Sequence, residues 1–312
     1  MKALVTGANG FVGTALCARL AASGHGVVPA VRRMSGLPHE IVVGNLDAST
    51  DWRPALSGCD VVIHLAARVH VMDDTADDPL TLYRATNTDA TLNLAGQAMQ
   101  ARVKRFVYVS SIKVNGEGGD VPYRETDAAA PEDAYAISKW EAEQGLHRIA
   151  ADTGLEVVIL RPPLVYGPGV KANFLNMMRW LHRGVPLPFG AIHNRRSLVA
   201  LDNLVDFIVA CLDHPAAANQ TFLVSDGEDL STTDLLRRMA AALNVPARLF
   251  PVPQNLLEAG FKAVGESALA RRLCGSLQLD ITKARTVLSW YPPVPVNEGL
   301  HRTAAHFLRG RS

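Results

Sequence analysis

The chain has 312 residues, of which 48% are hydrophobic and 20% are charged. This composition allows a sizeable buried core and differs from that of a disordered chain. A formal net charge of +1 provides no strong field for nucleic acid or an anionic membrane surface, so neither is expected as a partner. The four cysteines form no C-x-x-C pair, which favours free thiols in the cytoplasm and no metal site. No apolar run approaches the roughly 20 residues of a membrane helix, so membrane insertion is not expected.

In chain order, the first half alternates short runs of Val, Ile and Leu with helical patterns. Strands are predicted over 2–6, 26–31, 40–43, 61–65, 105–109 and 156–160. Helices are predicted over 10–23, 80–102 and 133–152. Strands with few internal charges are typical of a sheet covered on both faces. Their alternation with helices predicts a doubly wound parallel sheet.

The character of the sequence changes after Arg161. Prolines and glycines cluster through 162–190, helical patterns dominate from about 202, and short strands are predicted near 195–199 and 220–224. We therefore expect an α/β fold with a dinucleotide-binding domain over 1–165. A smaller, mainly helical substrate-binding region is expected over 166–312, with some of its segments returning to the main sheet.

A glycine-rich turn joins the first predicted strand to the first helix, with the sequence Gly7-Ala-Asn-Gly10-Phe-Val-Gly13. Gly7 permits a tight turn, Gly10 lets the backbone approach a pyrophosphate, and Gly13 lets the helix pack on the strand. The spacing alone is a weak signal. Its strand–turn–helix context predicts dinucleotide binding and a Rossmann-type sheet.

The end of the second strand bears on the choice of cofactor. Sites that prefer NAD place Asp or Glu there to bind the ribose hydroxyls. This chain has Arg32 and Arg33, with no acid before Glu40. Because an arginine pair attracts a 2′-phosphate, NADP(H) is favoured and NAD(H) remains possible. The alternative is that both arginines are simply solvated.

Catalytic residues are predicted where strands end. Tyr135-Ala-Ile-Ser-Lys139 lies on a predicted helix, and its i, i+4 spacing puts phenol and ammonium on one face. Ser110-Ser111 and His64-Leu-Ala-Ala67 follow two strands, at the edge where such sheets bind ligands. We predict that Ser111, Tyr135 and Lys139 are catalytic.

Together with the stretches 60–67, 87–91, 161–168 and 195–202, these motifs resemble the extended short-chain dehydrogenase/reductase superfamily, nucleotide-sugar epimerase/dehydratase branch. The match runs nearly end to end. The resemblance implies that Lys139, with the positive nicotinamide, stabilises the phenolate and so lowers the pKa of Tyr135, and that Lys139 also holds the nicotinamide ribose. Tyr135 would then exchange a proton with the sugar O4, and Ser111 would bind the same oxygen.

The resemblance also assigns binding residues. The cofactor would be lined by Gly7, Asn9, Gly10, Phe11, Val12, Asn45, Leu46, Leu65, Ala66, Ala67, Asn87 and Pro162, together with Tyr135 and Lys139. The nucleoside diphosphate of a UDP-sugar would be bound by Asn173, Leu187, Phe189, Arg196 and Arg272. The family usually has Asp where Asn45 stands, and asparagine keeps a hydrogen-bond acceptor there without the charge. In relatives the helices matching 80–102 and 133–152 form a four-helix interface, which implies a homodimer.

The reaction is narrowed by the residues after Ser111. Dehydratases of this family have an Asp-Glu pair there, whereas this chain has Ile112-Lys113, and isoleucine cannot transfer protons. The absence of an acid after the second strand, and the stretches 68–72, 110–117 and 163–174, favour a bacterial O-antigen subgroup. The expected reaction is NADPH-dependent reduction of a UDP-4-keto-6-deoxy-N-acetylhexosamine to UDP-N-acetylquinovosamine.

Two alternatives stay open. The first is a UDP-glucose or UDP-N-acetylglucosamine 4-epimerase with tightly bound NAD, because the same motifs serve both reactions. The second, more remote, is a non-catalytic dinucleotide-sensing protein, although such proteins typically lose the Tyr/Lys pair that is present here. His70 and Lys113 lie in loops that could approach the sugar.

Overall fold

The computed structural model describes residues 1–69 and 78–310, so His70 lies outside the described residues. Its main sheet has the order β3-β2-β1-β4-β5-β6-β9, and each pairing is parallel. The predicted doubly wound parallel sheet is therefore confirmed. The strands are β1 (Lys2–Thr6), β2 (Gly26–Val31), β3 (Ile41–Val42), β4 (Val61–His64), β5 (Arg105–Val109), β6 (Glu156–Arg161) and β9 (Gln220–Leu223).

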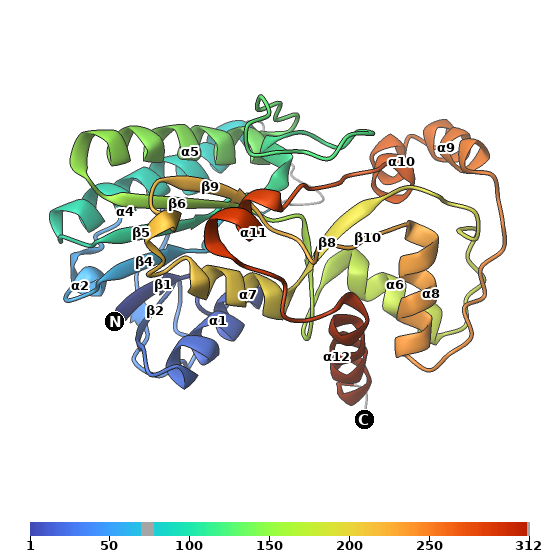
Figure 1. Cartoon of the computed structure of the whole chain (residues 1–312), viewed down its shortest axis with the longest axis horizontal. Helices are drawn as coiled ribbons and strands as arrows, with labels where there is room; N and C mark the ends of the chain where they lie inside the picture. Colours follow the sequence, from blue (N-terminus) through green and yellow to red (C-terminus); the bar gives the residue numbers. More distant parts are fainter. Residues whose placement is uncertain (70–77, 311–312) are drawn as a thin grey trace.

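Helices cover both faces of this sheet (Figure 1). One layer contains α1 (Phe11–Ala22) and α7 (Leu201–Ala210), and the other contains α2 (Arg53–Leu56), α4 (Ala90–Gln100) and α5 (Ala134–Thr153). Successive strand residues point to opposite layers, so nearly every strand position is buried and apolar. Towards α1 and α7 point Val5, Ile63 and Val107; towards α4 and α5 point Leu4, Val62 and Phe106.

The C-terminal region has its own apolar core. A small sheet of β7 (Leu164–Tyr166), β8 (Arg196–Ala200) and β10 (Asp229–Leu230) packs with α6 (Ala172–His182), α8 (Thr232–Ala242) and α12 (Val296–Arg309). Beyond them lie α9 (Gln254–Ala263) and α10 (Ser267–Cys274), while α11 (Thr282–Leu288) lies against the main sheet (Figure 1). The predicted short strands correspond to β8 and β9, and β9 joins the main sheet beside β6. The mainly helical character of this region is confirmed.

The single helix predicted over 80–102 is interrupted. It consists of α3 (Pro79–Tyr83), a π-helical segment (Arg84–Asp89) and α4. The interruption contains Asn87 and Thr88, which are both buried. Both side chains hydrogen-bond Ser138 on α5, Asn87 to its hydroxyl and Thr88 to its carbonyl. The π-helical turn directs them towards α5, and such turns are often found at functional sites.

Two further properties concern the whole described chain. Within residues 1–69 and 78–310, every helix is too short or too polar to cross a membrane. The cysteines Cys17, Cys59, Cys211 and Cys274 are free thiols, and the last three are buried.

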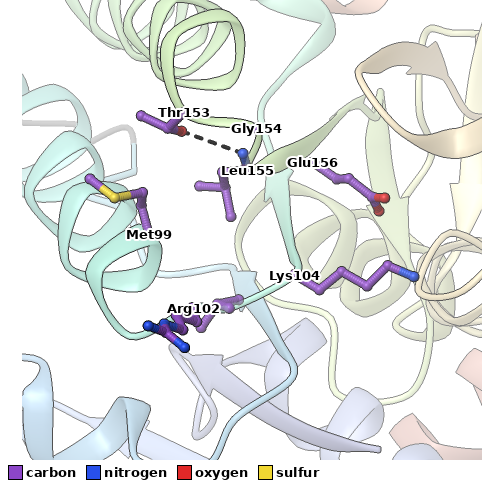
Figure 2. Close-up of a pocket in the computed structure, with 8 residues that line it drawn as sticks. Met99, Arg102, Lys104, Thr153, Gly154, Leu155 and Glu156 are labelled. Carbon is purple, nitrogen blue, oxygen red and sulfur yellow. Dashed lines mark hydrogen bonds between the residues drawn. The ribbon is translucent and has the colours of Figure 1, made fainter.

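A hollow of ≈ 290 Å³ lies at the amino-terminal ends of β5 and β6 (Figure 2). Its wall includes Met99, Arg102, Lys104 and Glu156, with Thr153 at the end of α5. Ligands of parallel sheets bind at the opposite edge, where the strands end. This hollow is therefore separate from the candidate site described next.

Candidate active site

The glycine turn has the geometry that its sequence predicts. Gly7 adopts a φ of +64°, and a Cβ there would lie 3.0 Å from the backbone nitrogen of Ala66. The Gly10 amide donates to the Gly7 carbonyl at 2.9 Å. A Cβ on Gly13 would overlap that same carbonyl and the backbone of Ala8. The turn therefore brings the N-terminus of α1, with its free amide groups, to the carboxyl end of β1, which fits a pyrophosphate.

Gly13→Ala tests this packing. The added methyl group has no room beside Gly7, so we expect a loss of stability of about 1–3 kcal/mol. Binding of the dinucleotide should weaken at the same time, because the turn must shift. The matched control is Gly260→Ala in α9, where nothing lies within 4 Å of the new Cβ and a gain of about 0.5–1 kcal/mol is expected. Urea unfolding measures the free energy of unfolding, and isothermal titration measures the Kd for NAD⁺. Equal values of both quantities for the two variants would contradict the packing role of Gly13.

A cavity of ≈ 470 Å³ opens at the carboxyl ends of β1, β2 and β4. It brings together eight of the residues predicted for the cofactor, from four separate stretches of sequence. Thr6, Met34, Trp52, Arg68 and Thr86 are further members of its wall. The predicted residues in the wall are Gly7, Asn9, Arg32, Arg33, Asn45, Leu46, Ala66 and Ala67. The glycine turn and this cavity together fit a dinucleotide.

Arg32 and Arg33 are exposed in the cavity wall, and neither forms an ion pair within the described residues. Glu40, the first acid after β2, is held elsewhere. Its carboxylate accepts hydrogen bonds from the Ser35 hydroxyl and from the amides of Ser35, Gly36 and Leu37, which lower its pKa to about 2. The wall therefore carries two cations and lacks the acid that binds a ribose in NAD-preferring sites.

Thr6 and His64 fix the chain that follows β4. The amides of Leu65 and Ala66 both donate to the Thr6 hydroxyl oxygen at 3.1 Å. That hydroxyl therefore donates its own proton to Nδ1 of His64, 2.7 Å away, and Nε2 of His64 carries the ring proton that Thr91 accepts at 2.9 Å. Burial lowers the pKa of His64 to about 3, so the ring is neutral. Its role is to hold the loop that follows β4.

Asn87 was predicted to line the cofactor, and the structure places it behind the cavity wall. Its Oδ1 accepts from the Arg68 amide at 2.8 Å, and its Nδ2 donates to the Arg68 carbonyl at 3.0 Å. The same Nδ2 donates to the Ser138 hydroxyl at 3.0 Å. Asn87 thereby connects the loop after β4 to the helix that carries Tyr135 and Lys139.

The structure brings Ser111 and Tyr135 together at the end of β5. Ser111 caps a 3₁₀ turn (Ile112–Val114), and its hydroxyl accepts from the Lys113 amide at 3.3 Å. A hydrogen bond to Ser111 acts to lower the pKa of Tyr135. The ring of Tyr83, from α3, meets the Tyr135 ring edge-on at 6.2 Å.

The chain's own groups around Tyr135 favour the neutral form of its phenol. Burial raises the pKa of Tyr135 to about 12, and the negative charge of Asp133 acts in the same direction. Lys139 is also desolvated, which lowers its pKa to about 7. Its Nζ donates to the Val109 carbonyl at 2.8 Å and lies 4.3 Å from the centre of the Tyr108 ring. These groups thus favour a neutral phenol, and the positive nicotinamide named in the expectation is a charge that the chain itself does not supply.

The remaining predicted cofactor residues lie near these groups. Phe11 and Val12 form the first turn of α1 and are half-buried, and Leu65 packs against the same apolar core. The carbonyl of Pro162 accepts from the Ile112 amide at 3.0 Å, next to Ser111. Their contacts with a cofactor stay predictions.

Two of the predicted substrate residues lie close to each other. Arg196 on β8 donates to the Gly275 carbonyl at 2.8 Å, and its pKa is lowered by burial and by the nearby charge of Arg272 on α10. Glu117 acts in the opposite direction on the same guanidinium. Two adjacent cations in a partly desolvated place suit a diphosphate.

The other predicted substrate residues are more dispersed. Asn173 is exposed at the start of α6, directly after Ala172, whose φ is +52°. Leu187 and Phe189 are only 6% and 8% exposed, because they pack into the core of the C-terminal region. Sequence resemblance placed these two at the substrate, whereas the structure shows that most of their surface serves packing.

Sequence reasoning missed one buried ion pair below the site. Glu143, one turn after Lys139 on α5, binds Arg161 of β6 through both its oxygens, and Arg161 also donates to Asn115 at 2.9 Å. The sequence signal that could have identified Glu143 is its i, i+4 spacing from Lys139, which places both side chains on one face of the helix.

Comparison with known proteins gives the family. A model of the NAD dependent epimerase/dehydratase family matches residues 3–225. The chain belongs to this family. It is therefore an NAD(P)-dependent enzyme of the short-chain oxidoreductase type, as the sequence motifs predicted.

Individual family members resemble the chain over its full length. A Vibrio cholerae protein named UDP-glucose 4-epimerase is 50% identical over 99% of this chain and 96% of its own length. An Escherichia coli O157:H7 protein, N-acetyl-alpha-D-glucosaminyl-diphospho-ditrans,octacis-undecaprenol 4-epimerase, is 28% identical over 96% of this chain and 93% of its own. Among solved structures, MoeE5 in complex with UDP-glucose and NAD superimposes with a TM-score of 0.80 at 27% identity, covering 100% of both chains.

Proposed function

We propose that this family member is a 4-epimerase of a UDP-hexose, with UDP-glucose as the first candidate. The observation that carries the proposal is the 50% identity with a UDP-glucose 4-epimerase along nearly the whole chain. The association of Ser111 with Tyr135, with Lys139 one helical turn further on, supports it. The comparisons thus favour the epimerase, whereas the sequence motifs had favoured the reductase.

In this proposal Tyr135 removes the proton from the sugar O4 and Ser111 orients that oxygen. A bound oxidised nicotinamide supplies a positive charge and a hydride acceptor. Lys139 lies one helical turn from Tyr135, and its low pKa lets it change protonation near neutral pH. Arg196 and Arg272 bind the diphosphate, so that the sugar can turn while the nucleotide stays fixed. Tyr135 then returns the proton to O4 of the turned keto sugar, and a bound reduced nicotinamide would supply the hydride to the opposite face of C4, which completes epimerisation.

The test is to incubate the purified protein with UDP-glucose and no added cofactor. We expect UDP-galactose to form, detected by chromatography, and NAD(P) to be released when the protein is denatured. UDP-N-acetylglucosamine is run in parallel. Absence of both epimers, with the protein folded and saturated with NAD⁺, would refute the epimerase.

The 4-keto reductase is the second candidate, and Arg32 and Arg33 in the cavity wall favour it. A reductase uses NADPH once and releases it, so a contact with the 2′-phosphate would be useful. NADPH oxidation with UDP-4-keto-6-deoxy-N-acetylglucosamine, with NADH in parallel, tests this reaction. Stoichiometric loss of NADPH absorbance and a new UDP-deoxysugar by mass would establish it.

The same arginines give a prediction for cofactor choice. In Arg32→Ala/Arg33→Ala, the Kd for NADP⁺ is expected to rise by about tenfold or more, because charge-assisted hydrogen bonds to the 2′-phosphate are lost. The Kd for NAD⁺ should stay within about twofold of the original. Arg53→Ala, which removes an exposed arginine paired with Asp51, is the control. Equal changes for both cofactors would show that the pair does not select the 2′-phosphate.

Assembly and location belong to the same proposal. We infer a homodimer that pairs the helices α3, α4 and α5, as the family resemblance implies, and light scattering of the purified protein tests it. A cytoplasmic location is supported by free cysteines throughout the described chain.

A further inference from the structure

Lys113 lies two residues after Ser111 and bridges two carboxylates. Its Nζ is 2.6 Å from Oδ2 of Asp133 and 2.6 Å from Oε1 of Glu117. The Lys113 side chain is 26% exposed, so the three charges are partly shielded from water. Such a cluster holds its members more firmly than an exposed surface pair does.

Asp133 has a second role that fixes its place. Its Oδ1 accepts from the Ala136 amide at 2.7 Å and so caps α5, the helix that carries Tyr135. The cap puts a carboxylate two residues before the phenol, where its negative charge raises the pKa of Tyr135. The group that begins the catalytic helix therefore opposes formation of the phenolate.

We propose that Lys113 is a positioning residue that neutralises the Asp133 carboxylate, and thereby allows Tyr135 to act as the base. The importance of Lys113 for turnover rests on the proposed function. The effect of Lys113 on the ionisation of Tyr135 is independent of that function. The ammonium is supplied by the short loop that also carries Ser111, so one segment both orients the sugar oxygen and controls the charge beside its base.

Two further cations lie near Tyr135 among the residues that the structure describes. On its own helix lie Asp133 and Lys139, and the latter directs its ammonium to Val109. Arg68 lies over the ring of Tyr83, which in turn meets the ring of Tyr135. Among the described residues, the titratable, charged and hydroxyl groups on the elements around Tyr135 are Asp133, Lys139, Tyr83, Tyr108, Ser111, Arg68, Lys113 and Glu117.

The decisive experiment is a tyrosinate titration by ultraviolet difference absorbance, with the protein saturated with NAD⁺. Subtracting the signal of a Tyr135→Phe counterpart isolates Tyr135 from the other tyrosines. In Lys113→Gln, ionisation of Tyr135 should move to higher pH. Adding Asp133→Asn should return it to the original position or below, because asparagine still caps the helix without the charge.

Glu117→Gln is the matched control, since it removes the other carboxylate and leaves Lys113 on Asp133. Its Tyr135 titration should not move to higher pH. Lys113→Arg keeps the charge, so its Tyr135 titration should match that of the original protein. This variant provides a second test if Lys113→Gln folds poorly. An unchanged titration in Lys113→Gln, or no reversal by Asp133→Asn, would overturn the proposal.

Turnover gives a second readout. The acidic limb of the kcat/KM profile should move to higher pH in Lys113→Gln, with activity about tenfold lower at neutral pH. The two ideas fail separately. If the titration moves but neither UDP-sugar is converted, the epimerase proposal fails and the role of Lys113 stands. If epimerisation occurs and the titration does not move, only the role of Lys113 fails.

Discussion

Tyr135→Phe is expected to lower the kcat for epimerisation by about 10²–10⁴-fold, the usual contribution of a positioned acid–base group. Phenylalanine keeps the ring that Tyr83 contacts at 6.2 Å and removes only the hydroxyl that transfers the proton. The melting temperature should therefore change little. The effect should appear in kcat rather than in KM, because the lost interaction acts on the reacting oxygen.

The control for this prediction is Tyr291→Phe. Tyr291 is 66% exposed, and its ring lies 5.8 Å from the Arg285 guanidinium, far in sequence from the active-site motifs. Steady-state kinetics on both variants should separate them by at least a hundredfold. Near-original turnover in Tyr135→Phe would mean that another group is the base. Retained biological activity without turnover would instead favour the dinucleotide-sensing alternative.

Glu143→Gln is expected to lower the free energy of unfolding by about 3–5 kcal/mol, since it leaves the buried Arg161 guanidinium without its counter-ion. The two side chains are 0% and 5% exposed, and their closest atoms are 2.5 Å apart. The pair joins α5 to β6 below the catalytic residues. We also expect weaker catalysis, because the negative charge of Glu143 raises the pKa of Lys139 and its loss leaves that lysine harder to protonate.

A second Glu–Arg pair, whose glutamate also lies on α5, provides the comparison. Arg84 and Glu141 also form an ion pair, but their side chains are 45% and 32% exposed. Glu141→Gln should therefore cost about 1 kcal/mol or less. Urea unfolding of both variants measures the difference, and Glu143→Met/Arg161→Met should recover much of the loss. Equal losses at the two positions would contradict the assigned importance of burial.

Much of the fold was predictable because its signals are local. Each strand of a doubly wound sheet is covered on both faces, so β1, β4 and β5 are apolar runs that can be recognised without their partners. The glycine turn follows from steric limits at Gly7 and Gly13, and Tyr135 and Lys139 are related by the period of one helix. The cofactor cavity could be anticipated for the same reason, since carboxyl ends of parallel strands meet at one edge.

The sequence by itself determined the strands and helices, the Rossmann-type sheet, the glycine turn and the residue types at the carboxyl ends of the strands. These features depend on backbone sterics and on hydrophobic periodicity, which act over a few neighbouring residues. Only the tertiary structure decided which distant side chains meet. It placed Asn87 behind the cavity wall, buried Leu187 and Phe189 in a core, and set Asp133 and Lys113 against each other beside Tyr135. Desolvation depends on everything packed around a group, so the raised pKa of Tyr135 and the lowered pKa of Lys139 could be obtained only from the folded chain.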